Sequence, residues 1–238
     1  MNVLAIGAHP DDIELGCAGA LLAHQRAGDA ITLLVLTKGE QGPQSETSRV
    51  REQEDAAASL GARLLWGRFE DGCVASDRRA IAVIEDAIRI AGADVVYMHA
   101  PNDSHQDHRA AAVASLSAAR RLSRVLCYES PTSLAFNPTV YVDVAGLVEA
   151  KLDLIRCHVS QVLKNGLVDL EAVEAQARYR GFSGRLKYAE AFEAQRFHWA
   201  PGAAVPESPS GRWWSADEAV AAPFSSLDTV SYEGVDIQ

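Results

Sequence analysis

The chain has 238 residues, of which 48% are hydrophobic, 23% charged and 7% aromatic. These proportions are typical of a globular protein with a buried core, and they exclude disordered, collagen-like and disulfide-scaffold proteins. Thirty-two acidic residues against 22 basic ones give a net charge of −10. That charge argues against nucleic acid as a partner, because a phosphate backbone attracts basic proteins.

The sequence also bears on membrane insertion and redox environment. No window approaches 18 consecutive apolar residues, so we expect no membrane-spanning helix. The chain begins with a short apolar run rather than a charged secretory leader, and its cysteines form no CxxC pair. The four cysteines are Cys17, Cys73, Cys127 and Cys157. These features predict reduced thiols in a cytoplasmic protein.

Short apolar runs alternate with helical patterns over the first 130 residues. We expect strands at residues 3–8, 30–37, 63–66, 94–99 and 125–129, and helices at about 14–27, 48–60, 78–91 and 109–121. Continuous apolar strands alternating with helices are typical of a mostly parallel sheet covered on both faces. The sequence therefore predicts a Rossmann-like, three-layer α/β fold with strand order 3-2-1-4-5 in this part of the sheet.

The second half of the chain has a weaker pattern. We expect one further strand at 139–144 and helices at 147–158 and 170–179. Residues 201–238 contain four of the nine prolines, and six acidic residues against one arginine. We therefore predict one α/β domain over residues 1–200. The acidic, proline-rich tail over residues 201–238 is predicted to be extended, or to dock on the body or a neighbouring subunit.

Two polar clusters follow two of the predicted strands. The first strand ends in Ala8-His9-Pro10-Asp11-Asp12, where a dinucleotide-binding protein would have a glycine-rich turn. The fourth strand ends in His99, and its loop carries His105-Gln106-Asp107-His108. With the strand order given above, strands one and four are neighbours and a crevice opens at their carboxyl ends. The two clusters are therefore expected to face each other.

These side chains are suited to a catalytic metal centre. Two imidazoles and a carboxylate suit a divalent transition metal, and three protein ligands leave positions open for water and substrate. An extra carboxylate beside the ligands can take a proton from the attacking water. His105, if Asp107 keeps it cationic, can stabilise an oxyanion or protonate a leaving group. The ligand types alone fit both zinc and iron(II).

The motifs AHPDDIELGCAG and HQDHRAA resemble the LmbE-like (PIG-L) family of N-acetylglucosaminyl deacetylases. The resemblance extends over about residues 1–195, with weaker matches at Arg51 and Glu54, at Asp71-Gly72, at 158–161 and at 184–192. It implies the following roles: zinc ligands His9, Asp12 and His108, general base Asp11, and His105 with its partner Asp107 supporting the oxyanion or the leaving amine.

The resemblance also implies substrate contacts by Arg51 and Tyr188 and assembly into a homo-oligomer. An i,i+3 surface ion pair explains Arg51 and Glu54 equally well, and packing is a simpler role for Tyr188. The activity it implies is zinc-dependent N-deacetylation of an N-acetylglucosaminyl-type amino sugar or conjugate.

Other interpretations use the same residues. A metal-dependent hydratase adding water to an unsaturated dicarboxylate needs the same activated water, with Arg51 binding a carboxylate. An iron oxygenase with two histidines and one carboxylate is a third candidate, and a non-catalytic metal- or sugar-binding subunit is a fourth. The simplest alternative is that His9 and Asp12 only cap the first helix.

Overall fold

The computed structural model of the chain describes residues 1–42, 46–162, 168–198 and 228–230. In chain order the elements are β1 (Asn2–Gly7), α1 (Asp12–Arg26), β2 (Ala30–Val35), α2 (Glu46–Leu60), β3 (Arg63–Trp66), α3 (Arg78–Ala91), β4 (Val95–His99), α4 (Gln106–Ala118), β5 (Arg124–Tyr128), β6 (Val140–Asp143), α5 (Val148–Arg156), α6 (Val159–Val162), α7 (Leu170–Ser183), β7 (Ala189–Phe197) and β8 (Asp228–Val230). The predicted tail, residues 201–238, lies outside the described residues except for β8.

The described strands form one sheet in the order β6-β7-β5-β4-β1-β2-β3-β8. Its central strands, β3-β2-β1-β4-β5, are parallel, which confirms the predicted fold class and strand order. β7 pairs antiparallel with both β5 and β6, and β8 pairs antiparallel with β3. The sheet is therefore mixed, with antiparallel strands added to each side of a parallel centre.

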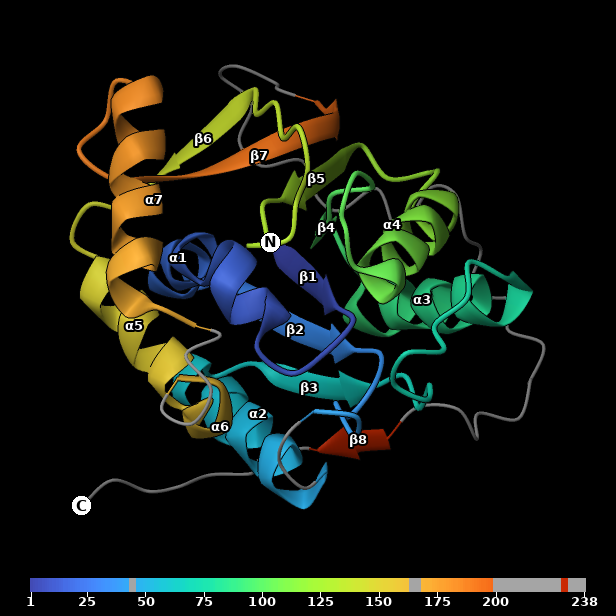
Figure 1. Cartoon of the computed structure of the whole chain (residues 1–238). Coiled ribbons are helices and arrows are strands. Elements are labelled where there is room, and N and C mark those ends of the chain that lie inside the picture. The colour runs from blue at the N-terminus through green and yellow to red at the C-terminus, as the bar shows by residue number, and fades with distance from the viewer. Residues whose placement is uncertain (43–45, 163–167, 199–227, 231–238) are drawn as a thin grey trace.

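Helices cover both faces of this sheet (Figure 1). One core contains side chains of α1, α2 and α5, among them Leu21, Leu60 and Leu154. The other contains side chains of α3 and α4, among them Ile84 and Ala111. Because the central strands are buried on both faces, their sequences are continuous apolar runs rather than alternating ones.

β7 was not predicted from the sequence. Its residues, AEAFEAQRF, include alanine, glutamate and glutamine, which favour helices over strands. Tertiary contacts override that preference: β7 lies between β5 and β6, and its buried Glu190 pairs with Lys151 of α5 at 2.6 Å.

One boundary matters for the candidate site. α4 begins at Gln106, three residues before its predicted start, and His105 is its N-cap. The prediction that the HQDH motif lies in a loop is therefore wrong, because Asp107 and His108 belong to the first turn of the helix. Among the described helices, none has the length and apolar character needed to cross a membrane.

Candidate metal centre

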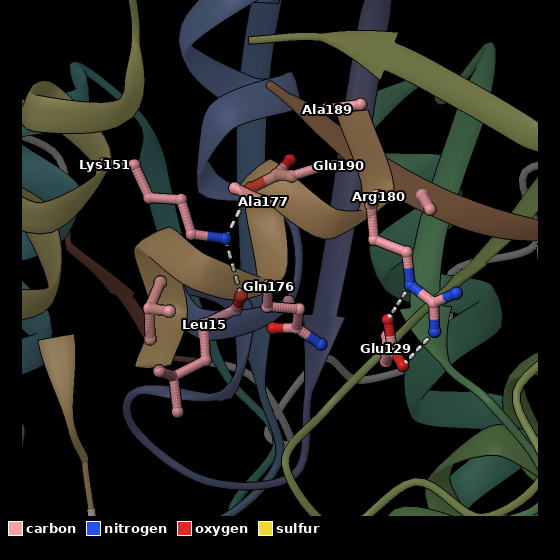
Figure 2. A pocket seen from close by; sticks show the side chains of 11 residues that line it. Leu15, Glu129, Lys151, Gln176, Ala177, Arg180, Ala189 and Glu190 are labelled. Atoms are coloured by element: carbon pink, nitrogen blue, oxygen red, sulfur yellow. Dashed lines mark hydrogen bonds and ion pairs between the residues drawn. The ribbon is translucent and has the colours of Figure 1, made fainter. Parts of the chain in front are cut away.

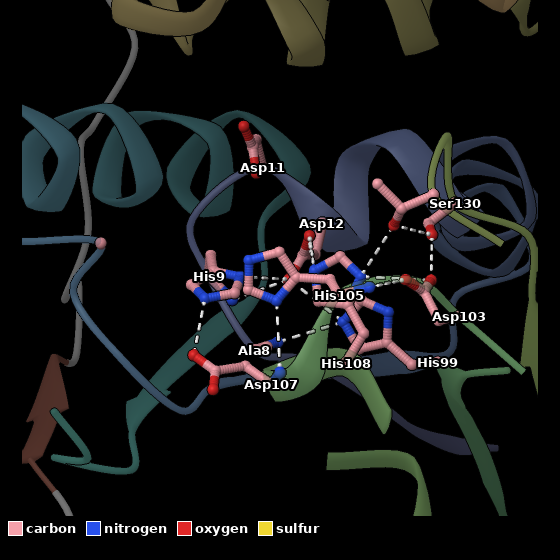
Figure 3. A network of polar contacts seen from close by, with 12 residues as sticks. Ala8, His9, Asp11, Asp12, His99, Asp103, His105, Asp107, His108 and Ser130 are labelled. Atoms are coloured by element: carbon pink, nitrogen blue, oxygen red, sulfur yellow. Dashed lines mark hydrogen bonds and ion pairs between the residues drawn. The ribbon is translucent and has the colours of Figure 1, made fainter. Parts of the chain in front are cut away.

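The two polar clusters meet at the carboxyl ends of β1 and β4. These strands are parallel neighbours, with Ala5 opposite Tyr97. The chain turns directly from β1 into α1, and β4 leads through a short loop into α4. The His9 ring centroid lies 4.8 Å from that of His105 and 5.3 Å from that of His108. Figure 3 shows these rings in one polar network with Asp12.

Carboxylates hold one side of the buried His9 ring. Its Nε2 lies 3.0 Å from Asp71 Oδ1 and 3.1 Å from Asp107 Oδ2, whereas its Nδ1 lies 3.4 Å from Asp12 Oδ2. Burial lowers the pKa of His9, but hydrogen bonds to Asp107, Asp12 and Asp71 outweigh it and raise the pKa to about 12. The surroundings therefore favour positive charge at this position. In the neutral ring, a proton on Nε2 is donated to the carboxylates there, and the Nδ1 lone pair is directed at Asp12.

His108 has the complementary arrangement. Its Nδ1 lies 3.2 Å from Asp103 Oδ2 and its Nε2 lies 3.3 Å from Asp12 Oδ1. The Asp103 carboxylate accepts hydrogen bonds from the Ser130 hydroxyl at 2.7 Å and the His105 backbone N–H at 2.8 Å. Burial lowers the pKa of His108, but Asp12 and Asp103 raise it to about 9. A nitrogen of each histidine thus faces Asp12 while a carboxylate holds the other.

Among the described residues, three groups have ligand atoms within 4.8 Å of one another and could hold a metal ion: His9-His105-His108, Asp12-His99-His108 and His9-Asp71-Asp107. The predicted ligands His9, Asp12 and His108 each belong to at least one of these overlapping groups. Burial raises the pKa of Asp12, but His108 and His99 outweigh it and lower the pKa well below its usual range, so this carboxylate is ionised. Asp71, Asp103 and Asp107 add carboxylates around the two imidazoles. A cation between the three candidate ligands would supply the positive charge that this arrangement favours and leave both imidazoles neutral, as metal ligands must be. Two nitrogens and one carboxylate oxygen suit zinc or iron(II).

Asp11 lies beside the candidate ligands without joining their hydrogen bonds. It is the N-cap residue of α1, yet its side chain makes no capping hydrogen bond, and in Figure 3 it stands apart from the dashed network. Its carboxylate lies 3.6 Å from Arg49 Nη2. Burial raises the pKa of Asp11, as does the charge of Asp12, while Arg49 opposes them, and the pKa is about 6. The N-cap of α1 is Asp11 rather than His9 or Asp12, and the Asp12 carboxylate accepts from the His9 N–H at 2.7 Å and lies 3.1 Å from His99 Nε2. Helix capping alone therefore does not account for His9 and Asp12.

His105 is close to the cluster but is not paired as the sequence analysis expected. Its Nδ1 accepts a hydrogen bond from the Asp107 backbone N–H at 3.2 Å. Burial lowers the pKa of His105, as do the charges of His108 and His9. A ring that accepts at Nδ1 is neutral and carries its proton on Nε2.

The prediction that Asp107 keeps His105 cationic is therefore wrong. The Asp107 carboxylate accepts hydrogen bonds from the backbone N–H groups of Gly72 at 2.8 Å and Val74 at 3.2 Å, and it contacts His9. The physical reason is the early start of α4. Asp107 lies in the first helical turn, so its backbone N–H donates to the ring of the N-cap residue His105, and its carboxylate reaches the loop after β3.

The structure brings a different arginine to the cluster from the one predicted. Arg51 is exposed, whereas Arg49 is buried and donates from Nη2 to the Pro10 carbonyl at 2.7 Å. Residues 49–54, Arg-Val-Arg-Glu-Gln-Glu, contain two overlapping Arg-x-x-Glu spacings, because Arg49 precedes Glu52 and Arg51 precedes Glu54 by three. The sequence signal that distinguishes Arg49 from Arg51 is helical periodicity, which places Arg49 on the buried side of α2.

Tyr188 is likewise not among the cluster's contacts. It is partly exposed, and its hydroxyl donates to Glu174 Oε1 of α7 at 3.0 Å. Of the other residues that reach the cluster, only Asp103 gave no signal in the sequence, since Asp71 lies in the Asp71-Gly72 match and His99 ends the fourth predicted strand. Asp71 and Asp103 orient the two histidines. His99 is buried, stacks on His108 with centroids 4.0 Å apart, and has its Nε2 3.1 Å from Asp12 Oδ2.

A small pocket lies between α1, α7 and β7 (Figure 2). Lys151 Nζ donates there to the Leu15 carbonyl at 2.7 Å and to Glu190. On the other side, the Arg180 guanidinium makes two hydrogen bonds to the Glu129 carboxylate. Glu129 directly precedes Ser130, which bonds Asp103, so this pocket borders the segment that orients His108.

The sheet is mainly parallel, and imidazoles and a carboxylate converge at the ends of neighbouring strands. These features define a class of α/β proteins with a candidate metal centre in the crevice of the sheet. The chain belongs to the PIG-L family. The family's description is GlcNAc-PI de-N-acetylase, and it matches residues 4–119, which include both motifs.

Curated relatives extend this family assignment. An Escherichia coli (strain K12) protein named uncharacterized deacetylase YaiS is 37% identical over 157 residues, covering 60% of this chain and 82% of the relative. Diacetylchitobiose deacetylase of Thermococcus kodakarensis is 27% identical over 186 residues, covering 67% of this chain and 70% of the relative.

Solved structures show the same fold. The conserved protein TT1542 from Thermus thermophilus has a TM-score of 0.76 and 27% identity, covering 86% of this chain and 99% of that one. GalB, a 4-carboxy-2-hydroxymuconate hydratase from Pseudomonas putida KT2440, has a TM-score of 0.72 and 21% identity, covering 86% of this chain and 100% of that one. The second likeness concerns the fold alone, so the fold does not by itself select a reaction.

Proposed function

We propose that this protein is a zinc-dependent hydrolase that removes the acetyl group from an N-acetylglucosaminyl-type amino sugar or conjugate. One observation carries the proposal: nitrogens of His9 and His108 both face the ionised Asp12, while carboxylates hold their opposite nitrogens. The names of the curated relatives, both deacetylases, support the reaction type.

The candidate ligands are His9 Nδ1, a carboxylate oxygen of Asp12 and His108 Nε2. When bound there, zinc supplies Lewis-acid polarisation of the amide carbonyl and lowers the pKa of water to about 7. Asp71 and Asp107 orient His9, and Asp103 orients His108. Such outer carboxylates fix the tautomer and the direction of each ligand nitrogen.

Two other residues carry the proton transfers and charge stabilisation in this proposal. Asp11 takes the proton of the attacking water, because its carboxylate is next to Asp12 in the chain and is not used as a helix cap. Neutral His105 donates from Nε2 to the carbonyl oxygen as negative charge develops on it. Asp11 then carries the proton that it took from the water, whereas His105 is used as a hydrogen-bond donor. Asp11 gives this proton to the leaving amine, which completes hydrolysis to acetate and a free amine.

The relatives support the proposed substrate class. The family description and the Thermococcus kodakarensis protein both name N-acetylated glucosamine compounds. We therefore propose small N-acetylglucosaminides and diacetylchitobiose as the first substrates to examine.

Acetate release from a panel of these compounds tests the proposal. The protein is stripped of metal and reconstituted with zinc, or with iron(II) under anaerobic conditions. We expect zinc-dependent acetate release. We also expect Asp11→Asn to lower kcat by about 10²- to 10⁴-fold while it binds the same amount of zinc per chain as the parent. Asp55→Asn, at an exposed position on α2, is the matched control and is expected to match the parent.

Two results would overturn the assignment. An Asp11→Asn variant that hydrolyses as fast as the parent would remove Asp11 as the base. Metal-loaded protein that releases no acetate from any amide, but consumes an unsaturated dicarboxylate, would replace the deacetylase with a hydratase.

A further inference from the structure

We propose that Gln53 is a positioning residue that holds the candidate base Asp11 in its functional conformation. Gln53 lies on α2 and is fully buried. The hydrogen bonds of its side chain go to the Asp11 backbone N–H and to Glu14 rather than to a candidate metal ligand, so its effect on the reaction passes through Asp11. The inference rests on the proposed function, in which Asp11 is the base.

Asp11 has a backbone conformation that needs support. Its φ is 98° and its ψ −26°, in the left-handed region that residues with a side chain rarely adopt. Arg68, Ala135 and Arg185 also have positive φ, but all three are exposed. Asp11 alone among the described non-glycine residues combines this conformation with burial. Such strain persists only where surrounding contacts enforce it.

Gln53 provides that contact through its side-chain amide. The Asp11 backbone N–H donates to Gln53 Oε1 at 3.2 Å, and Gln53 Nε2 donates to Glu14 Oε1 at 2.8 Å. The amide can have only this orientation, because a backbone N–H only donates and a carboxylate only accepts. Glu14 is held in turn by His158, whose Nε2 lies 3.2 Å from Glu14 Oε2.

Loss of this amide would release the turn. The Asp11 N–H would be buried without an acceptor, which favours rotation of the backbone to an ordinary conformation. That rotation would move the Asp11 carboxylate from its present place, 3.6 Å from Arg49 Nη2. Arg49 does not replace Gln53, since it contacts the Asp11 carboxylate and the Pro10 carbonyl rather than the Asp11 N–H.

The test compares two glutamines that both link α1 to α2. Gln53→Met removes the contact with Asp11. Gln25→Met is the matched control, because Gln25 Nε2 donates to the Leu60 carbonyl at 2.7 Å, far along both helices from Asp11. For the zinc-loaded enzyme we expect Gln53→Met to lower kcat about 10- to 100-fold, with KM and bound zinc within about twofold of the parent. Gln25→Met should keep the parental kcat.

A second comparison shows whether Gln53 acts through Asp11. In an Asp11→Asn background, Gln53→Met is expected to cause no further loss of kcat, because residues that act as a unit are not additive. A full additional loss in that background would overturn the proposal, as would a Gln53→Met enzyme with the parental kcat.

A charge-swap pair covers the case in which Gln53→Met does not fold. Gln53→Glu places a carboxylate against the Glu14 carboxylate. The double variant Gln53→Glu with Glu14→Gln keeps an acceptor for the Asp11 N–H at position 53 and supplies an amide donor at position 14. We expect the double variant to recover kcat relative to Gln53→Glu alone. Equal kcat in the two would contradict the positioning role.

Failure of the proposed function would be distinguishable from failure of this inference. If the parent releases no acetate, the proposed function fails, and crystal structures of the parent and Gln53→Met then decide the role of Gln53. A change of Asp11 to negative φ in the variant supports the inference, and a φ still near 98° overturns it.

Discussion

The Lys151–Glu190 pair and the His/Asp cluster at the ends of β1 and β4 are both buried, yet only the first is balanced in charge. Glu190 accepts hydrogen bonds from Lys151 Nζ at 2.6 Å and from the backbone N–H groups of Gly19 at 2.8 Å and Ala20 at 2.7 Å. The one carboxylate has a cation and two further donors, all supplied by the protein.

In the His/Asp cluster, carboxylates outnumber the permanent cations. Asp12, Asp71, Asp103 and Asp107 surround His9 and His108, whose positive charge depends on protonation. Burying unpaired carboxylates costs free energy, so the fold alone does not account for this arrangement. The comparison teaches that the Lys151–Glu190 pair has its charges matched within the protein, whereas the carboxylates of the cluster favour an added cation such as the proposed metal ion.

The largest effect on stability is expected at the balanced pair. Lys151→Met leaves Glu190 buried without its cation and should lower the free energy of unfolding by about 3–5 kcal/mol, measured by urea denaturation. The double variant Lys151→Met with Glu190→Leu removes both charges and should be less destabilised than the single one. A single variant within about 1 kcal/mol of the parent would break the comparison.

Zinc should stabilise the protein through the unbalanced cluster. At a free zinc concentration about 1,000 times Kd, linkage predicts about 4 kcal/mol of added stability, seen as a higher urea midpoint than in metal-stripped protein. Asp12→Asn removes a candidate ligand and should abolish the increment, whereas Lys151→Met should retain it. An unchanged increment in Asp12→Asn would show that zinc binds elsewhere.

The carboxylates outside the ligand set should have a smaller effect. Asp103→Asn removes the charge that holds His108 Nδ1 and is expected to weaken zinc affinity about 10- to 100-fold. Competition with a chromogenic chelator measures this change. Glu85→Gln, at an exposed ion pair with Arg120, serves as the control and should bind zinc like the parent.

The smallest predicted effect is a pH dependence from a third buried group. Burial lowers the pKa of His158, but Glu14, Asp11 and Glu52 outweigh it and raise the pKa above its ordinary value of 6.5. A raised folded pKa means that the contribution to stability is complete below about pH 6.5 and is lost as pH rises through the folded pKa.

Chelator-treated protein allows this dependence to be measured without metal. The difference in unfolding free energy between the parent and His158→Gln should be largest at about pH 6 and should shrink towards alkaline pH. Gln25→Met, which removes no titratable group, should show no such trend. A difference that grows with pH would contradict the assigned sign.

The fold was predictable where the hydrophobic pattern of a segment pointed to a single kind of element. Buried parallel strands such as β2 and β4 are continuous apolar runs, so periodicity and topology together placed His9 and His108 at neighbouring strand ends. β7 was missed because its alanines and glutamates favour a helix, and only its neighbours in the sheet reverse that preference. The tail's docking, homo-oligomer assembly and cytoplasmic location stay predictions.

The site was predictable in its residue types but not in its pairings. Spacing identified Asp107 and His105 without revealing which histidine each carboxylate holds, because the pairing depends on where α4 begins. Arg49 and Arg51 have the same Arg-x-x-Glu spacing, and only their position relative to the core distinguishes them. Gln53 gave no signal, since a buried amide is recognised by its partners rather than by a motif.

The separation of the two clusters along the chain has a consequence for how the protein matures. His9 and Asp107 are 98 residues apart in sequence, and they meet only after β4 has paired with β1. A nascent or partly unfolded chain therefore offers a cation no more than two of the three candidate ligands. Closing so long a loop costs conformational entropy that a metal ion recovers only once the strands are paired. Metal uptake during refolding would then report the pairing of β1 with β4, which makes it a kinetic marker for assembly of the sheet's centre.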